Sequence, residues 1–323
     1  LGGDEFVAVL ADMGTSGQEA ANRTEAVGEK ILAALGQDYQ LDTGAYRSTS
    51  SIGATLFKSN RTSIDDILKQ ADLAMYKAKY AGRNALRFFD PDMEMAVLER
   101  AALERDLRLA VRERQFLLHY QPQVFGARRV TGAEVLVRWQ HPGRGLVGPG
   151  EFIPLAEETG LILPLGRWVL ETVCCQLALW TTHPELADLT IAVNVSAHQF
   201  RDPGFVDTVL GMLRDTGADP HRLKLELTES ILVANVEDII GRMGALKARG
   251  VGFSLDDFGT GYSSLSYLKR LPLDQLKIDQ SFVRDILVDP NDAAIAKTIV
   301  ALADSLGLDV IAEGVETGAQ RDF

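Results

Sequence analysis

The sequence predicts an α/β protein whose C-terminal part is a (β/α) barrel, preceded by a smaller α+β domain. From Phe116 onward, short apolar runs typical of strands alternate with amphipathic segments typical of helices. Strands that mostly alternate with crossover segments indicate a parallel sheet, and at this length a barrel. An open doubly wound sheet is the main alternative, but no glycine-rich fingerprint follows any of the strands.

The expected barrel elements follow one another through residues 113–323. The expected strands cover residues 116–121, 130–137, 189–195, 223–227, 251–256, 275–278 and 309–312. The amphipathic segments between them include residues 163–180, 205–216, 236–249 and 292–306. Because a helix would be starting where the chain stops, we expect the last strand and helix of the barrel to lie beyond Phe323.

Residues 1–90 form the expected smaller domain, with helices over 16–36 and 63–81 and strands over 6–10 and 49–57. Gly2-Gly3-Asp4 before the first strand indicates a tight turn. A strand that opens a chain at its own hairpin lacks its partner, so we expect this domain to be the C-terminal part of a larger one. Residues 91–112 are charged and free of glycine, and they are expected to form a helical linker.

Charge and cysteine content narrow the function. The net charge of −12 excludes duplex nucleic acid as a partner, because that binding depends on Lys and Arg contacts to phosphates. The cysteines, Cys174 and Cys175, are neighbours in a helix-like stretch and are poor disulfide partners. We therefore expect these domains to be reduced and cytoplasmic. No run of 18 apolar residues occurs, but membrane tethering by an upstream segment stays open.

Polar side chains stand at or near the ends of the apolar barrel strands. These residues are Glu134, Asn194, Glu226, Asp256, Asp257, Lys277 and Glu313, with Glu316 close behind. In a (β/α) barrel the C-terminal strand ends build the active site, so we expect these side chains to converge on one rim. A single acidic residue at a strand end is usually a helix cap or a solvated residue, but capping does not explain so many strands ending this way.

The carboxylates at this rim outnumber the cations Lys277 and Arg138. Without compensation the like charges would raise one another's pKa and destabilise the fold, and a divalent cation resolves this conflict. Carboxylate and amide oxygens without His or Cys select Mg²⁺, Mn²⁺ or Ca²⁺ over Zn²⁺. The pair Asp256-Asp257 can serve two ions, and two ions about 3.5–4 Å apart are a recurring device for phosphodiester hydrolysis.

Several motifs follow one another through residues 113–323. They are Tyr120-Gln121-Pro122, Glu134-Val135-Leu136-Val137-Arg138-Trp139, Asn194-Val195-Ser196, Glu226-Leu227-Thr228-Glu229, the run from Asp256-Asp257-Phe258-Gly259 to Leu265, Leu276-Lys277-Ile278-Asp279 and Ala312-Glu313-Gly314-Val315-Glu316. In this order they resemble the EAL family of cyclic di-GMP phosphodiesterases. Val135 stands where the name-giving motif has alanine.

The resemblance implies a role for each matched residue. Glu134, Asn194, Glu226 and Asp256 would ligate one Mg²⁺ or Mn²⁺ ion, and Asp256 and Asp257 would serve a second. Lys277 and Glu313 would position the attacking water, with Glu313 as the favoured general base. Gln121, Leu136 and Arg138 would contact cyclic di-GMP. Glu229 would hold the loop from Asp257 to Leu265, which in the family couples the metal site to a homodimer interface, and Glu316 would support the site. The implied product is the linear dinucleotide pGpG.

Residues 1–90 resemble the C-terminal part of a GGDEF diguanylate cyclase domain. The motif Gly2-Gly3-Asp4-Glu5-Phe6 is intact, and the stretch from Ala71 through Lys79 to Gly82-Arg83-Asn84 matches the late helix of that family. The resemblance implies that Lys79 and Arg83 face the phosphates of GTP and that Asp4 faces a metal. Whether this part makes, binds or ignores GTP stays open.

Two other functions compete with hydrolysis of cyclic di-GMP. One is a catalytically silent receptor that binds the dinucleotide and signals through the linker helix. Loss of metal ligands would mark such a receptor, and every ligand position that can be checked is filled. The other is a metal-dependent barrel that acts on a different phosphodiester, which the number of matching motifs disfavours.

Overall fold

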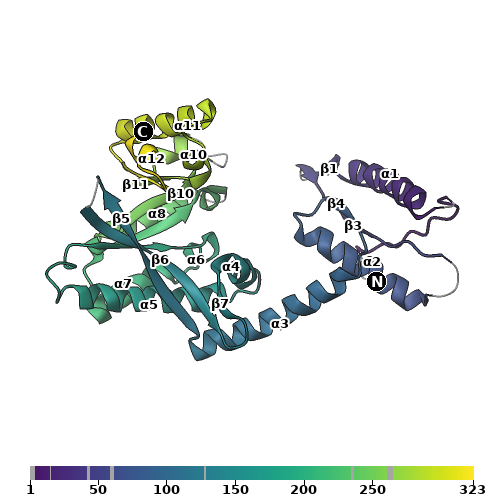
Figure 1. Cartoon of the computed structure of the whole chain (residues 1–323), viewed down its shortest axis with the longest axis horizontal. Helices are drawn as coiled ribbons and strands as arrows, with labels where there is room; N and C mark the ends of the chain where they lie inside the picture. Colours follow the sequence, from purple (N-terminus) through teal and green to yellow (C-terminus); the bar gives the residue numbers. More distant parts are fainter. Residues whose placement is uncertain are drawn as a thin grey trace. The chain divides into compact units, whose positions relative to one another are not determined.

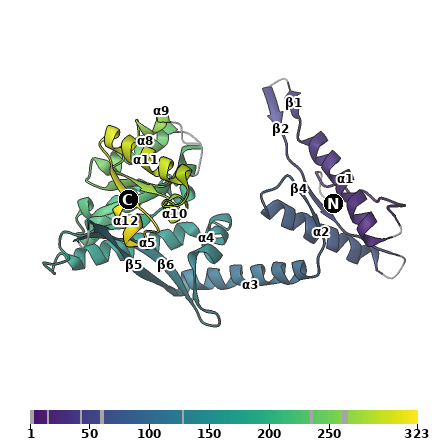
Figure 2. The ribbon, with the colours of Figure 1, turned by 45° about the horizontal axis from the view of Figure 1, so that its top comes forward.

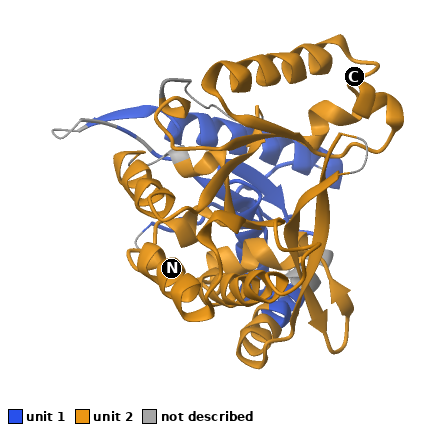
Figure 3. Cartoon of the chain, turned by 90° about the vertical axis from the view of Figure 1, so that its left-hand side faces the viewer, with its two compact units in different colours: residues 1–103 blue, residues 104–323 orange. Residues whose placement is uncertain are grey.

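The computed structural model describes residues 4–14, 16–41, 44–58, 62–126, 129–233, 236–259 and 265–323. The chain divides into two compact units, residues 1–103 and residues 104–323 (Figure 3). The helix predicted in the charged stretch between the domains is confirmed as α3 (Asp92–Glu113), within which the limit between the units falls.

The first unit combines two helices with short strands (Figure 1). Its elements are α1 (Gly17–Leu35), β1 (Asp38–Leu41), β2 (Gly44–Arg47), β3 (Ser51–Ala54), α2 (Ile64–Tyr80) and β4 (Ala85–Phe88). β1 pairs with β2 in antiparallel fashion, and β3 pairs with β4 in parallel. Ser63 caps α2, because its side chain accepts a hydrogen bond from the Asp66 N–H at 3.1 Å.

The strand predicted over residues 6–10 is wrong. Residues 5–14 form neither helix nor strand, and Phe6 is 91% exposed. A strand is held by hydrogen bonds to a neighbouring strand, and within the described part of the chain no strand pairs with this segment. The apolar run alone was therefore not enough to make it a strand.

The second unit is built on one curled sheet, in the order β12-β11-β10-β9-β8-β6-β5 with β7 beside β6. The strands are β5 (Phe116–Phe125), β6 (Arg129–His141), β7 (Gly145–Val147), β8 (Thr190–Asn194), β9 (Leu223–Thr228), β10 (Gly252–Phe258), β11 (Gln275–Ile278) and β12 (Asp309–Ala312). Each neighbouring pair from β6 through β8 to β12 is parallel. This arrangement confirms the predicted (β/α)-barrel class.

The first pair of this sheet departs from the expected parallel pattern, because β5 and β6 form a long antiparallel hairpin. A parallel pair needs a crossover of a dozen or more residues, whereas only residues 126–128 connect these strands. β7, which was not predicted, extends the hairpin as a further antiparallel strand. In Figure 1, β5 and β6 cross the unit as its longest strands.

Helices connect the parallel strands (Figure 2). They are α4 (Pro149–Glu158), α5 (Ile162–Trp180), α6 (Ala197–Phe200), α7 (Phe205–Thr216), α8 (Val236–Lys247), α9 (Leu265–Leu268), α10 (Gln280–Arg284) and α11 (Pro290–Leu306), with 3₁₀ turns η1 (Pro220–Arg222) and η2 (Glu229–Val233). α12 (Gly318–Asp322) follows the last strand, β12. The core lies between the sheet and these helices, where Leu225, Phe253 and Leu276 are fully buried.

By length and composition α5 is apolar enough to cross a membrane, the one such helix in the described part of the chain. Many of its apolar side chains are instead buried in the interior of the second unit. Val173, Cys174 and Leu177 are fully buried, and the helix packs against β8 and α7. Its apolar composition is therefore that of a core helix.

Candidate active site

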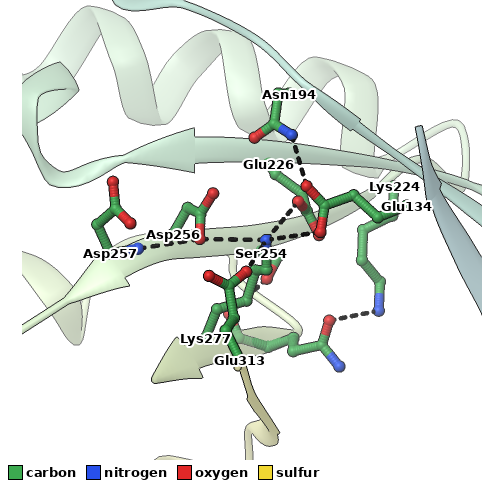
Figure 4. A network of polar contacts seen from close by, with 10 residues as sticks. Glu134, Asn194, Lys224, Glu226, Ser254, Asp256, Asp257, Lys277 and Glu313 are labelled. Atoms are coloured by element: carbon green, nitrogen blue, oxygen red, sulfur yellow. Dashed lines mark hydrogen bonds and ion pairs between the residues drawn. The ribbon is translucent and has the colours of Figure 1, made fainter. Parts of the chain in front are cut away.

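The register of the parallel strands brings their polar ends to one edge of the sheet. Asn194 at the end of β8 lies opposite Glu226 of β9, and Glu226 lies opposite Ser254 of β10. At the end of β12, the Glu313 N–H donates to the Ile278 carbonyl oxygen of β11 at 3.1 Å, which places Glu313 beside the end of β11. Side chains from strands far apart in the sequence therefore face the same small volume (Figure 4).

Lys277 is the centre of this group. Its side chain is 1% exposed, and its ammonium nitrogen lies near carboxylates from four other strands or strand ends. The distances from Lys277 Nζ are 3.1 Å to Glu134 Oε2, 2.7 Å to Glu226 Oε2, 3.1 Å to Asp256 Oδ1 and 2.6 Å to Glu313 Oε1. An ammonium group has three N–H donors, so it cannot hydrogen-bond fully to all four carboxylates at once. Four acidic groups surround this one cation, so the cluster holds more acidic groups than Lys277 can compensate.

Two oxygen atoms in the cluster are available to bind a cation. Glu226 Oε1 is buried and has no hydrogen-bond partner among the described residues, although Glu226 Oε2 is bonded to Lys277. Asn194 donates from Nδ2 to Glu134 Oε1 at 2.7 Å, which leaves its carbonyl oxygen as an acceptor. A buried carboxylate oxygen without a partner is costly, and a cation would satisfy it.

Asp256, Asp257 and Glu313 form a second part of the site. Ligand atoms of these residues all lie within 4.8 Å of one another. The Asp257 N–H donates to Asp256 Oδ1 at 3.0 Å, and the Asp257 backbone has a φ of 54°, a conformation uncommon for a residue with a side chain. This turn sends the neighbouring carboxylates Asp256 and Asp257 to the same side of the sheet edge, as Figure 4 shows.

Burial and crowding shift the pKa values of these groups. Burial raises the pKa of Glu226 to about 8, against the opposing effect of Lys277 and with a further contribution from Glu134. Burial also raises the pKa values of Asp257 and Glu313, and nearby Asp256 adds to both shifts. Burial alone would lower the pKa of Lys277, but the surrounding carboxylates, Glu226 foremost, outweigh it and raise that pKa. Lys277 is therefore a permanent cation at neutral pH.

The donors of the cluster fit a hard divalent cation. They are carboxylate oxygens and one amide oxygen, and neither His nor Cys is among them. The unsatisfied Glu226 oxygen and the excess of carboxylates over Lys277 are the features that such an ion would compensate. The acidic cluster predicted from the strand ends can therefore bind metal.

Glu316 and Arg138 form their hydrogen bonds away from the carboxylates around Lys277, and the roles expected for them stay predictions. Gly314, directly after Glu313, has a φ of 66°, in the left-handed region that favours glycine. Glu316 is exposed, and its N–H donates to Gln320 Oε1 at 3.0 Å beside the start of α12. Arg138 lies four residues beyond Glu134 on β6, about 13 Å along the strand, and its Nη1 donates to the Val137 carbonyl oxygen at 2.9 Å.

The other expected substrate contacts lie close to Glu134. Gln121 is exposed on β5 directly opposite Glu134 in the hairpin register. Leu136 is half-buried two residues beyond Glu134 on β6, so its side chain stands on the same face of the sheet. Glu229 follows β9, and its Oε1 accepts a hydrogen bond from the Gly259 N–H at 2.9 Å. Residues 260–264 of the loop that Glu229 was expected to hold lie outside the described residues.

Sequence reasoning assigned no role to Asp279, although this residue ends a matched motif. Its carboxylate shares a hydrogen bond with Asp257, which contributes to the raised pKa of Asp257. It also caps α10 by accepting the Ser281 N–H at 2.9 Å. The position of Asp279, two residues after Lys277 and directly after β11, was the signal that could have identified it.

The expected nucleotide contacts of the first unit are exposed where they are described. Asp4 and Glu5 are exposed, and Lys79 is exposed in the last turn of α2. Arg83 is exposed and follows α2 with a φ of 59°. Gly2 and Gly3 lie outside the described residues.

Comparison with known protein families and structures agrees with this geometry. The family described as EAL domain matches residues 104–323. The chain belongs to the EAL domain family. The family described as diguanylate cyclase, GGDEF domain matches residues 1–85. Both resemblances predicted from the sequence are confirmed.

Curated relatives and a solved structure share this EAL domain. The bifunctional diguanylate cyclase/cyclic di-GMP phosphodiesterase MucR of Pseudomonas aeruginosa is 44% identical over 324 residues, which cover 100% of this chain and 46% of MucR. The cyclic di-GMP phosphodiesterase PdeR of Escherichia coli is 39% identical over 322 residues, which cover 100% of this chain and 48% of PdeR. The chain spans about half the length of these relatives.

The structure of the PaMucR phosphodiesterase in complex with c-di-GMP is similar to the EAL domain of this chain. The TM-score is 0.66 at 49% sequence identity, over 68% of this chain and 90% of that structure. The (β/α)-barrel class of the second unit is therefore shared with a solved EAL structure.

Proposed function

We propose that the EAL domain of this chain hydrolyses cyclic di-GMP to the linear dinucleotide pGpG in a reaction that depends on divalent metal ions. The observation that carries the proposal is the cluster around Lys277, in which carboxylates from separate strands meet at one edge of the sheet. The names of MucR and PdeR, which both include cyclic di-GMP phosphodiesterase, support the choice of substrate.

Two Mg²⁺ or Mn²⁺ ions are the proposed cofactors. Glu134, Asn194, Glu226 and Asp256 would hold the first ion, and Asp256 with Asp257 would hold the second. When bound, such ions lower the pKa of water and stabilise charge on the oxygens of a phosphodiester. The excess of carboxylates and the unpartnered Glu226 oxygen support this assignment.

Glu313 is the proposed general base and Lys277 its partner. Water attacks phosphorus while Glu313 accepts the water proton, and the bond from phosphorus to the 3′ oxygen breaks. The 3′ oxygen takes up a proton, so that a 5′-phosphate and a free 3′-hydroxyl result. Glu313 lies 2.6 Å from the Lys277 ammonium, which orients the carboxylate and stabilises negative charge that develops on the phosphate.

Gln121, Leu136 and Arg138 are the proposed contacts to the dinucleotide. Leu136 and Arg138 lie at alternate positions after Glu134 on β6, on the side of the strand that Glu134 occupies. Gln121 lies across the hairpin from Glu134. A substrate bound along β6 would reach all three while its phosphate lies at the carboxylate cluster.

The remaining proposals concern a homodimer interface, the nucleotide of the GGDEF part and the cellular location. We place a homodimer interface on the EAL domain, with Glu229 holding the loop that begins at Gly259 through the hydrogen bond between them. GTP is the proposed nucleotide of the GGDEF part, through Asp4, Lys79 and Arg83. Both domains are placed in the cytoplasm, where the free thiols Cys174 and Cys175 would stay reduced.

Incubation of the full-length protein with cyclic di-GMP and Mg²⁺ or Mn²⁺, followed by product chromatography, tests the proposed function. Hydrolysis yields the linear dinucleotide, and EDTA suppresses it. A silent receptor would bind cyclic di-GMP and return it unchanged under every metal condition. That result would overturn the proposed catalysis, whereas cleavage of other phosphodiesters at an equal rate would overturn the proposed substrate.

A further inference from the structure

Asn194 contributes the amide of the proposed metal site from an exposed position at the end of β8. Its Nδ2 donates to Glu134 Oε1 at 2.7 Å, so its Oδ1 is the atom available to a cation. An exposed side chain on the last residue of a strand has several rotamers open to it. Its direction depends on the hydrogen bond to Glu134 and on what holds the backbone that follows.

The backbone after Asn194 is held by three hydrogen bonds. The Val195 N–H donates to the Glu226 carbonyl oxygen at 2.9 Å, which ties the segment to β9. Ser196 Oγ accepts the Gln199 N–H at 3.2 Å, and Gln199 Oε1 accepts the Ser196 N–H at 3.1 Å. The last two bonds form a capping box at the start of α6. Val195 and Ser196, the two residues that follow Asn194, are therefore both held in place.

α6 contains only residues 197–200 and is too short to be stable alone, so it needs support from the core. Phe200 is fully buried, with its ring centroid 5.2 Å from that of Phe205 and 6.2 Å from that of Phe253 on β10. Gln199 is itself only 5% exposed. Gln199, which belongs to the capping box, is thus buried together with Phe200.

Gly166 on α5 provides the surface against which the Gln199 amide packs. A Cβ atom at Gly166 would overlap Gln199 Nε2, so this close approach requires glycine. Gly166 lies inside α5 and is buried, a helical position where glycine costs about 1 kcal/mol relative to alanine. The space needed by Gln199 is a physical reason for accepting that cost.

We propose that Gln199 is a positioning residue of the metal site, clamped between Gly166 and the Ser196 backbone so that Asn194 presents its carbonyl oxygen to the ion. The inference deepens the proposed function, because it rests on metal binding by Asn194. Mutation of a residue that orients a metal ligand typically lowers the metal affinity about 10–100-fold. Gln199 acts through the backbone rather than by touching the ion.

The test is a double-mutant cycle on Mn²⁺ affinity, measured by calorimetry in the full-length protein without substrate. Gln199→Met keeps the length of the side chain but removes the acceptor for the Ser196 N–H, and it should weaken Mn²⁺ binding about tenfold or more. In an Asn194→Ala background the same change should have little further effect, because the ligand that it positions is gone. Unchanged affinity, or losses that add fully, would overturn the inference.

A second pair of variants keeps the test decisive should Gln199→Met fold poorly. Gly166→Ala should weaken Mn²⁺ binding, because the added methyl group displaces the Gln199 amide. Gly244→Ala on α8 is the matched control, since a Cβ there meets no atom within 4 Å, and it should bind Mn²⁺ as the unaltered protein does. Equal affinity of the two alanine variants would contradict the clamp.

The outcomes separate this inference from the proposed function. If the unaltered protein bound no Mn²⁺, the metal site itself would be wrong. If the unaltered protein bound Mn²⁺ and Asn194→Ala weakened it, while Gln199→Met and Gly166→Ala did not, then only the role of Gln199 would fall.

Discussion

Lys277 Nζ lies 2.7 Å from Glu226 Oε2, and both side chains are almost completely buried. The other oxygen of the same Glu226 carboxylate is buried, and it has no hydrogen-bond partner within the part of the chain that the structure describes. Lys277 therefore pairs with one of the two Glu226 oxygens while also contacting three further carboxylates. This shared cation links the stability of the sheet edge to the chemistry proposed for it.

Replacement of Lys277 by methionine should destabilise the metal-free protein. The change leaves buried carboxylates without their counter-ion, and removing one partner of a buried ion pair costs about 3–5 kcal/mol. Chemical denaturation in EDTA measures the loss, with Lys269→Met, an exposed lysine, as control. Added Mn²⁺ should restore part of the stability of Lys277→Met. A metal-free variant as stable as the unaltered protein would contradict the role of Lys277 as counter-ion.

The raised pKa of Glu226 predicts how the stability of the metal-free protein varies with pH. Burial raises this pKa from 4.5 to about 8, so between these values the folded protein holds a proton that the unfolded chain has released. The stability that Glu226 contributes is therefore present below pH 4.5 and is lost as the pH rises to about 8.

Thermal unfolding in EDTA across this pH window checks the prediction. The melting temperature should fall as pH rises, and Glu226→Gln should flatten the decline because glutamine does not titrate. A saturating concentration of Mg²⁺ should also flatten it, since the ion replaces the proton. A melting temperature that rises across the window in the unaltered protein but not in Glu226→Gln would refute the raised pKa of Glu226.

Glu313→Gln should lower turnover while leaving cyclic di-GMP binding intact. Glutamine keeps the shape of the side chain but cannot accept a proton, and general-base catalysis typically contributes about 10²–10⁴-fold. Single-turnover kinetics and equilibrium binding in Mn²⁺ separate the two effects. An equal loss of binding and turnover would indicate that Glu313 is a metal ligand or a structural residue.

Cys174 and Cys175 should differ sharply in reactivity. Both thiols are free, Cys174 is buried and Cys175 is exposed. Burial, with the neighbouring Cys175, raises the pKa of Cys174 to about 12, so little thiolate forms at mildly alkaline pH. A thiol-specific reagent should therefore label only Cys175 in the folded protein and both residues after denaturation. Labelling of a folded Cys175→Ala variant would show that Cys174 is accessible.

The strands and their polar ends could be predicted because both depend on local pattern. Apolar runs marked every strand from β5 to β12 except β7, and the barrel class then implied that Glu134, Glu226 and Asp256 lie near one another. β7 is only three residues long and depends on its pairing with β6, so it left no periodic signal of its own.

Other features depended on contacts that sequence spacing does not encode. Which of the predicted carboxylates contact Lys277 is decided by the register between strands, which places Glu134 at 3.1 Å and Glu313 at 2.6 Å from its ammonium nitrogen. Glu316 lies beyond Gly314, whose φ is 66°, and its N–H donates to Gln320 Oε1 beside the start of α12. The capping box of Ser196 and Gln199 is a recognisable spacing, but its link to Gly166 appears only when α5 packs beside α6.

Hydrolysis of cyclic di-GMP in ¹⁸O-labelled water tests the central claim most directly. The account predicts that the full-length protein, with Mn²⁺ present, yields the linear dinucleotide with one ¹⁸O atom in its terminal phosphate. Asp256→Asn, which removes a proposed shared ligand, should give no product under the same conditions. Intact cyclic di-GMP after incubation of the unaltered protein, or undiminished labelling by Asp256→Asn, would contradict a metal-dependent hydrolase at this site.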